Sequence, residues 1–133
     1  MIFVDTSFWV GVTIPSDDRH DAARELMSAH SSVRLVTSSH VRGETWTLLR
    51  RRVGHRVAVA FLDRIERTER LEIVPAEQSL ELEALDWLRR HDERPYSFVD
   101  ATSFALMRSL GIREALAFDG DFAAAGFVEL RPA

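Results

Sequence analysis

The segment Ile2-Phe3-Val4-Asp5-Thr6-Ser7 gives the strongest indication of the fold. Three apolar residues typical of a buried strand lead directly into an acid, and two hydroxyl residues follow it. In an open α/β sheet, ligands bind in the crevice beyond the carboxyl ends of the strands. The segment therefore predicts a central strand that presents the Asp5 carboxylate to a site. We expect further carboxylates to reach the same edge of the sheet.

The rest of the chain alternates short apolar strands with helices. Strands are expected over 33–36, 71–74, 115–118 and 127–130. Helices are expected over 8–12, from Asp17 or Asp18 to about His30, around 41–49 and 57–65 on the two sides of Gly54, over 77–91, and from Ser97 to about Leu110. This alternation predicts an α/β domain with a mostly parallel five-stranded sheet flanked by helices. Two successive helices after the second strand predict a helical arm that stands off the sheet.

Length and hydropathy predict one domain over residues 1–133, because a chain of 133 residues can bury a sizeable core by itself. No apolar run approaches the roughly 20 residues needed to span a bilayer. The N-terminus lacks the basic start and the cleavage site of a signal peptide. We therefore expect a cytoplasmic protein with no membrane partner.

Cysteine and lysine are both absent. The missing cysteine excludes disulfides, thiolate nucleophiles and iron–sulfur clusters, and the missing lysine excludes Schiff-base chemistry and the P-loop lysine. The net charge of −4 does not exclude a nucleic-acid partner. If several acids converge on a metal ion, their charge is offset locally, and the 17 basic residues, all arginine, can still form a positive rim.

Four acids stand out by position. Asp5 and Asp119 directly follow apolar strands, whereas Glu44 and Asp100 lie on the core-side faces of expected helices. Carboxylates gathered at one sheet edge repel one another, and a divalent cation removes the repulsion. Oxygen-only ligation suits magnesium or manganese, and phosphodiester hydrolysis is the chemistry that such a site performs best.

Each acid also has a local interpretation. Asp5 and Asp100 can cap helices, and Asp119-Gly120-Asp121 can form a turn. Glu44 can pair with Arg42 or with an arginine of the run 50–52. These alternatives stay open at the level of sequence.

Four segments, in this order and strand context, match a known pattern: Ile2–Ser7, the isolated Glu44, Phe98-Val99-Asp100-Ala101, and Ala117-Phe118-Asp119-Gly120-Asp121-Phe122. They resemble the PIN-domain nucleases. In length and build the chain is similar to the VapC-type toxins of bacterial type II toxin–antitoxin pairs.

The resemblance implies a PIN-like fold and a magnesium-dependent endoribonuclease, with manganese as a substitute metal. Asp5 and Asp100 would be the most direct metal ligands, and Glu44 and Asp119 would bind directly or through water. Asp121 is a fifth acid, and whether it supports these ligands or holds a second ion stays open. The resemblance also implies an RNA substrate, a cognate antitoxin and a homodimer.

Two further features have competing interpretations. The Thr6 hydroxyl can contact a carboxylate or the scissile phosphate, or it can cap a helix. Arg50, Arg51 and Arg52 can grip RNA phosphates, or they can form a solvated helix end, where arginine is favourable.

Three other functions remain as alternatives. A phospho-receiver also gathers acids around magnesium, but it ordinarily needs a lysine. A catalytically silent PIN scaffold would bind RNA or protein without cutting. A housekeeping RNA-processing nuclease would share the site but not the role of a toxin.

Overall fold

The structure, a computed structural model, describes all 133 residues. Its elements in chain order are β1 (Ile2–Val4), α1 (Thr6–Thr13), α2 (His20–Ala29), β2 (Leu35–Ser38), α3 (Ser39–Arg52), α4 (His55–Arg67), β3 (Leu71–Val74), α5 (Gln78–Arg90), α6 (Phe98–Leu110), β4 (Glu114–Leu116), α7 (Asp121–Ala124) and β5 (Val128–Glu129). The five strands form one sheet in the order β3-β2-β1-β4-β5, and every pairing is parallel. The predicted α/β class and five-stranded sheet are confirmed.

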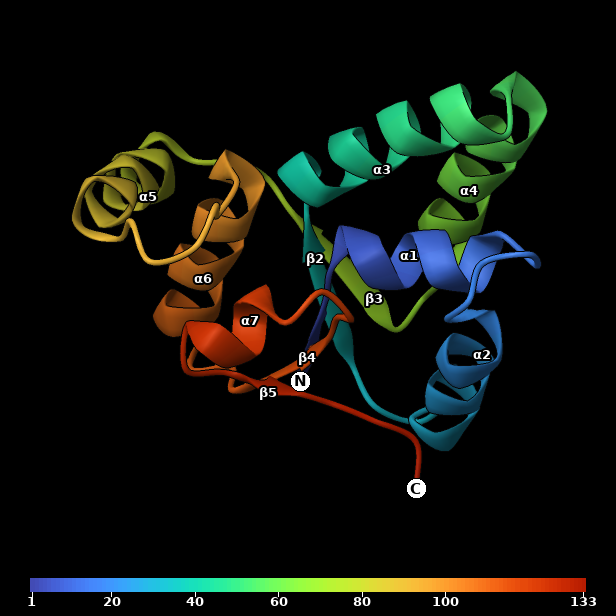
Figure 1. Ribbon diagram of the computed structural model, residues 1–133. Coiled ribbons are helices and arrows are strands. Elements are labelled where there is room, and N and C mark those ends of the chain that lie inside the picture. Colours follow the sequence, from blue (N-terminus) through green and yellow to red (C-terminus); the bar gives the residue numbers. More distant parts are fainter.

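Helices cover both faces of the sheet. In Figure 1, α5, α6 and α7 lie to the left of the sheet, α1, α2 and α4 lie to its right, and α3 crosses above it. Strand β1 is fully buried at the centre, with Phe3 and Val4 inaccessible to solvent. Aromatic rings continue the core on the α7 side, where Phe122 packs against both Phe3 and Phe104. No helix combines the length and apolar character needed to cross a membrane.

Serine side chains cap the N-termini of α3 and α6 and explain where these two helices begin. The Ser38 hydroxyl accepts from Val41 N at the start of α3, and Ser97 caps α6 in the same way. The predicted start of α2 is wrong, because Arg19 occupies its N-cap and neither Asp17 nor Asp18 caps the helix. Instead, the Asp17 carboxylate accepts from Arg19 N and closes the turn before α2.

The strand predicted over 33–36 lies at Leu35–Ser38 instead. Two other expectations need correction, and one helix was not expected. Strand β4 ends at Leu116 rather than at 118, because Phe118 N donates to the Ser7 hydroxyl instead of to a neighbouring strand. Helix α7 directly follows the Asp119-Gly120 turn and was not expected, since a four-residue helix leaves no periodic pattern. The predicted arm of α3 and α4 forms, but α3 packs on α1 and α6 as well as on α4, so it does not stand free of the body.

The topology sets the position of the site. Strands β1 and β4 are neighbours and run parallel, so the residues that follow them emerge at the same edge of the sheet. The N-terminal half of α3 and the first turn of α6 border this edge, because α3 packs against α6.

Candidate active site

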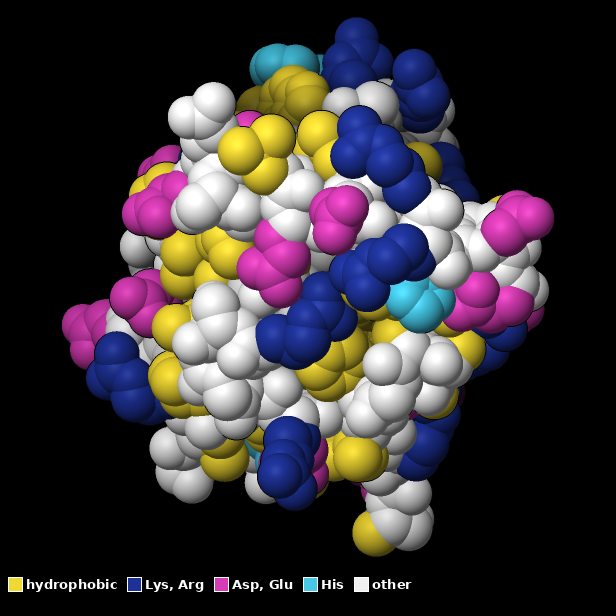
Figure 2. Space-filling view, turned by 90° about the vertical axis from the view of Figure 1, so that its left-hand side faces the viewer, with side chains coloured by type: hydrophobic (Ala, Val, Ile, Leu, Met, Phe, Trp, Pro, Cys, Tyr) yellow, Lys and Arg dark blue, Asp and Glu magenta, His cyan; other side chains and the backbone are white.

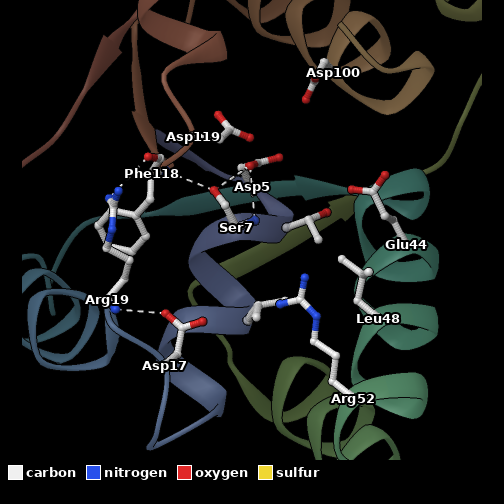
Figure 3. A pocket seen from close by; sticks show the side chains of 12 residues that line it. Asp5, Ser7, Asp17, Arg19, Glu44, Leu48, Arg52, Asp100, Phe118 and Asp119 are labelled. Carbon is white, nitrogen blue, oxygen red and sulfur yellow. Dashed lines mark hydrogen bonds between the residues drawn. The ribbon is translucent and has the colours of Figure 1, made fainter. Parts of the chain in front are cut away.

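The four acids predicted from the sequence line one hollow of about 310 Å³. Their carboxylates point into a common space (Figure 3). They come from four places in the fold: the end of β1 (Asp5), α3 (Glu44), the first turn of α6 (Asp100) and the segment after β4 (Asp119). Segments far apart in the sequence thus contribute one carboxylate each.

Asp5 is both a helix cap and part of the hollow. Its Oδ2 atom accepts from Ser7 N at 3.1 Å and from the Ser7 hydroxyl at 2.7 Å, which begins α1. Its Oδ1 atom has no hydrogen-bond partner. Burial raises the pKa of the Asp5 carboxyl to about 7, and the nearby Asp119 charge contributes to the rise. The cap interpretation and the site interpretation are therefore compatible.

Asp100 repeats this arrangement in α6. Its Oδ2 accepts from Ser97 N at 3.0 Å, while Asp100 N donates to the Ser97 hydroxyl at 2.9 Å, which makes a capping box. Burial raises the pKa of Asp100 to about 6, and the Asp119 charge adds to this effect. The second oxygen of Asp100 is left without a protein donor.

Asp119 and Glu44 complete the set. Asp119 lies at the exposed rim, yet burial of part of its carboxylate raises its pKa, and the charge of Asp121 acts in the same direction. Glu44 takes part in none of the ion pairs, so the predicted alternative of a pair with Arg42 or the 50–52 arginines is wrong.

Asp121 lies close to the acids but has a partner of its own. One oxygen each of Asp100, Asp119 and Asp121 lie within 4.8 Å of one another. Arg94, in the loop before α6, donates to Asp121 Oδ1 from Nε at 3.0 Å and from Nη2 at 2.9 Å. Asp121 is thus neutralised by a cation at the rim of the hollow.

The structure separates the remaining predicted residues. Thr6 lines the hollow, and its buried hydroxyl has no hydrogen-bond partner, so the capping alternative is wrong for Thr6. Arg52 lines the hollow, whereas Arg50 and Arg51 are exposed on α3 and do not reach it. Only one arginine of the run therefore faces the site.

The acids form a set that fits a divalent metal. Asp5, Asp100 and Asp119 each use one carboxylate oxygen to accept a local backbone N–H and leave the other oxygen free. The free oxygens, with that of Glu44, provide only hard donors, which magnesium and manganese prefer. The Thr6 hydroxyl beside them has no protein partner, so it is free to contact a further polar group.

Comparison with known proteins agrees with this geometry. The PIN-domain family pattern matches residues 2–128. The chain belongs to the PIN-domain family. It is 59% identical over 133 residues to the 23S rRNA-specific endonuclease VapC20 of Mycobacterium tuberculosis strains H37Rv and CDC 1551, covering 99% of both proteins. The predicted resemblance to VapC-type PIN-domain nucleases is therefore confirmed.

Solved structures agree with the fold of this PIN domain. The crystal structure of M. tuberculosis VapC20, described as a sarcin–ricin loop cleaving toxin, has a TM-score of 0.94 and 55% identity, covering 99% of this chain and 100% of that chain. FitAcB from Neisseria gonorrhoeae has a TM-score of 0.65 at 13% identity, covering 98% and 96%. At that identity the second comparison shows the shared fold alone.

Sequence reasoning missed several residues around the PIN-domain site. Ser7 holds Asp5 through its hydroxyl and accepts from Phe118 N at 3.0 Å, so it ties β1 to the segment after β4. Its position two residues after the strand-end acid is a signal that sequence analysis could have used. Arg19 lines the hollow and donates to Phe118 O at 3.2 Å. No local pattern marks Arg19, because its partner lies 99 residues away.

The raised pKa values predict that the metal-free protein loses stability as pH rises. A carboxyl with a folded pKa above its unfolded value binds its proton more tightly in the folded state. For Asp5 this stability is present below pH 3.8 and is lost as the pH rises to about 7. Asp100 adds a similar loss that is complete by about pH 6. Urea denaturation in EDTA should therefore show the free energy of unfolding falling by a few kcal/mol between about pH 4 and about pH 7.

The matched variant is Asp5→Asn, because asparagine keeps the cap but has no charge. We expect a smaller fall with pH in this variant. An equal fall in both proteins would show that Asp5 is not the source.

Proposed function

We propose that this PIN domain is a metal-dependent endoribonuclease toxin that cuts 23S rRNA in the sarcin–ricin loop. The observation that carries the proposal is the hollow in which Asp5, Glu44, Asp100 and Asp119 meet. The substrate follows from the 59% identity to a 23S rRNA-specific endonuclease over nearly the whole of both chains. The same sequence similarity favours a toxin over a housekeeping nuclease. The presence of all four acids argues against a catalytically silent scaffold.

We assign the acids as ligands of Mg²⁺, for which Mn²⁺ can substitute. Asp5 and Asp100 present their free oxygens directly, and Glu44 and Asp119 bind directly or through water. A bound Mg²⁺ would acidify water and offset the charge of the phosphodiester. We propose that the Thr6 hydroxyl donates to a phosphate oxygen, and its position in the lining of the hollow without a protein acceptor supports this role.

Arginine side chains would bind the RNA phosphates on either side of the scissile bond. Arg19 and Arg52 line the hollow beside the acids. Figure 2 shows dark-blue arginine side chains above and below magenta carboxylates on the face that α5 and α6 present. Such a mixed surface gives phosphate contacts without a net positive charge on the whole protein.

The open role of Asp121 is best explained by its partner. Two hydrogen bonds from Arg94 occupy one oxygen of Asp121 and offset its charge. We therefore infer that Asp121 and Arg94 act as a neutral pair beside the metal and that Asp121 is not a ligand. The pair would orient the Asp119-Gly120-Asp121 loop rather than hold an ion.

A double-mutant cycle tests this pair. Asp121→Asn leaves the Arg94 charge uncompensated and should weaken Mn²⁺ binding by about tenfold, whereas Arg94→Gln should strengthen it by a similar factor. The double variant should return close to wild-type affinity, because a neutral pair is replaced by two neutral groups. Calorimetric titration with Mn²⁺ measures all four proteins. A double variant that binds as weakly as Asp121→Asn would identify Asp121 as a ligand.

Several partners follow from the proposed role. A toxin needs an antitoxin that covers the acidic hollow, and a ribosomal substrate places its action in the cytoplasm. A homodimer has an available apolar surface on α5, where Leu82 and Leu85 are 58% and 39% exposed. An isologous contact through this helix would bury both leucines.

The test is incubation of the purified protein with intact ribosomes and with total RNA in Mg²⁺, followed by primer extension across the 23S rRNA. The proposal predicts one dominant cut within the sarcin–ricin loop. Cuts scattered over many RNAs would refute the substrate, and growth that continues during expression of the active protein would refute the toxin role.

A further inference from the structure

The last strand contains a buried acid that the proposed cleavage chemistry does not use. Glu129 lies in β5, and only 3% of its side chain is exposed. It does not line the acidic hollow. Burying a carboxylate costs free energy unless hydrogen-bond donors surround it. The donors that contact Glu129 therefore indicate the role of its charge.

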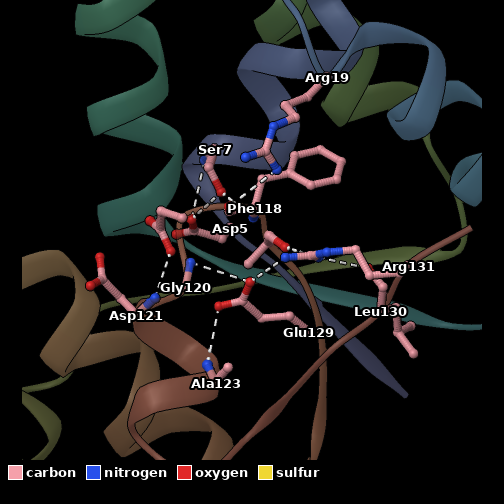
Figure 4. A network of polar contacts seen from close by, with 12 residues as sticks. Asp5, Ser7, Arg19, Phe118, Gly120, Asp121, Ala123, Glu129, Leu130 and Arg131 are labelled. Atoms are coloured by element: carbon pink, nitrogen blue, oxygen red, sulfur yellow. Dashed lines mark hydrogen bonds and ion pairs between the residues drawn. The ribbon is translucent and has the colours of Figure 1, made fainter.

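The donors to Glu129 come largely from the loop that carries the site acids. Its Oε1 atom accepts from Gly120 N at 3.3 Å, and its Oε2 atom accepts from Ala123 N at 3.1 Å. Gly120 and Ala123 stand on the two sides of Asp121, and Gly120 directly follows Asp119. One side chain thus holds the backbone at both ends of this turn (Figure 4).

Arg131 extends the contact to the preceding residues. Its Nη2 donates to Glu129 Oε1 at 2.7 Å, and its Nη1 donates to Ala117 O at 2.8 Å. Its guanidinium also lies over the Phe118 ring, 5.5 Å from the centroid. The segment from Ala117 to Ala123 is therefore fastened to the C-terminal segment as well as to Ser7 (Figure 4).

This segment needs such support. Strand β4 ends at Leu116, so the backbone that leads to Asp119 lies outside the strand ladder. Gly120 adopts a left-handed conformation with φ of 84°, which glycine provides at little cost but does not fix by itself. The position of the Asp119 carboxylate therefore depends on groups that hold this backbone from outside.

We propose that Glu129 and Arg131 are positioning residues for the metal site and hold the Asp119–Ala123 turn so that Asp119 faces the other carboxylates. The inference rests on the proposed function, because it concerns the same acidic hollow. Outer contacts that orient ligands commonly contribute about ten- to a hundredfold to metal affinity or activity.

The test variant is Glu129→Gln, which keeps the size of the side chain. Its amide nitrogen replaces one acceptor oxygen and faces an N–H donor, so at least one of the loop contacts is lost. In the metal-free protein, hydrogen exchange at the Gly120 and Ala123 amides should become about tenfold faster. Mn²⁺ affinity should fall by about tenfold, and kcat should fall while KM for RNA is unchanged.

Two further variants make the experiment decisive. Glu114→Gln changes an exposed glutamate at the start of β4 and should behave as wild type in every measurement. Arg131→Gln lies near the exposed end of the chain, so it tests the same contacts if Glu129→Gln folds poorly. It should also weaken Mn²⁺ binding.

The possible failures are distinguishable. Wild-type affinity and wild-type kcat in both Glu129→Gln and Arg131→Gln, despite faster amide exchange, would overturn the positioning role and leave only a structural one. A wild-type protein that binds no Mn²⁺ and cuts no RNA would instead overturn the proposed function itself.

Discussion

Replacing Asp5 with asparagine is expected to lower RNA cleavage by about a thousandfold, because the loss of this proposed metal ligand would remove several kcal/mol of transition-state stabilisation. Asparagine keeps the cap of α1, since its side-chain oxygen can still accept from Ser7 N. The fold should therefore persist. In metal-free buffer above pH 7 the variant should even be more stable than wild type, because the buried charge is gone.

Single-turnover kinetics measures the predicted loss of cleavage, and thermal denaturation measures the predicted change in stability. Asp63→Asn is the matched control, because Asp63 is exposed on α4 and distant from the hollow. It should leave cleavage and stability unchanged. If a folded Asp5→Asn protein cleaved RNA as fast as wild type, Asp5 would not be part of the catalytic site.

Removing divalent metal with EDTA is expected to abolish cleavage by the wild-type protein, and added Mg²⁺ or Mn²⁺ should restore it. Without the cation, the hollow holds carboxylates whose pKa values are raised by burial, and repulsion from neighbouring acids adds to the rise for Asp5, Asp100 and Asp119. A phosphodiester adds another negative charge and would be repelled. Added metal should therefore also raise the melting temperature of wild type.

The same titration in Asp5→Asn gives the control for metal removal. This variant should show little thermal stabilisation by Mg²⁺, because it lacks a carboxylate that we propose as a direct ligand. Cleavage that continues unchanged in excess EDTA would rule out the metal-dependent reaction.

Local signals were enough to predict much of the site. An apolar segment ending in an acid identified Asp5 and Asp119, although β4 ends at Leu116, before Phe118, and helical spacing placed Glu44 on an apolar face. These signals work because strand ends and helix faces are set by nearby residues. They also gave the α/β class, since strands that alternate with helices favour a parallel sheet.

The rest depends on contacts between distant parts of the chain. The pair of Arg94 with Asp121 spans 27 residues, and the contact from Phe118 N to Ser7 spans 111. No period or spacing indicates such pairs, because they form only when folding brings distant segments together. The residues that hold the site acids in place therefore could not be predicted from the sequence, although most of the acids themselves could.

The most direct test of the central claim is cleavage of 23S rRNA in intact ribosomes by wild type and Asp100→Asn, prepared identically and assayed with Mg²⁺. The proposed function predicts a cut in the sarcin–ricin loop by wild type, and the proposed role of Asp100 predicts none by the variant. A cut at the same position and rate by Asp100→Asn would contradict the account and place the catalytic centre elsewhere.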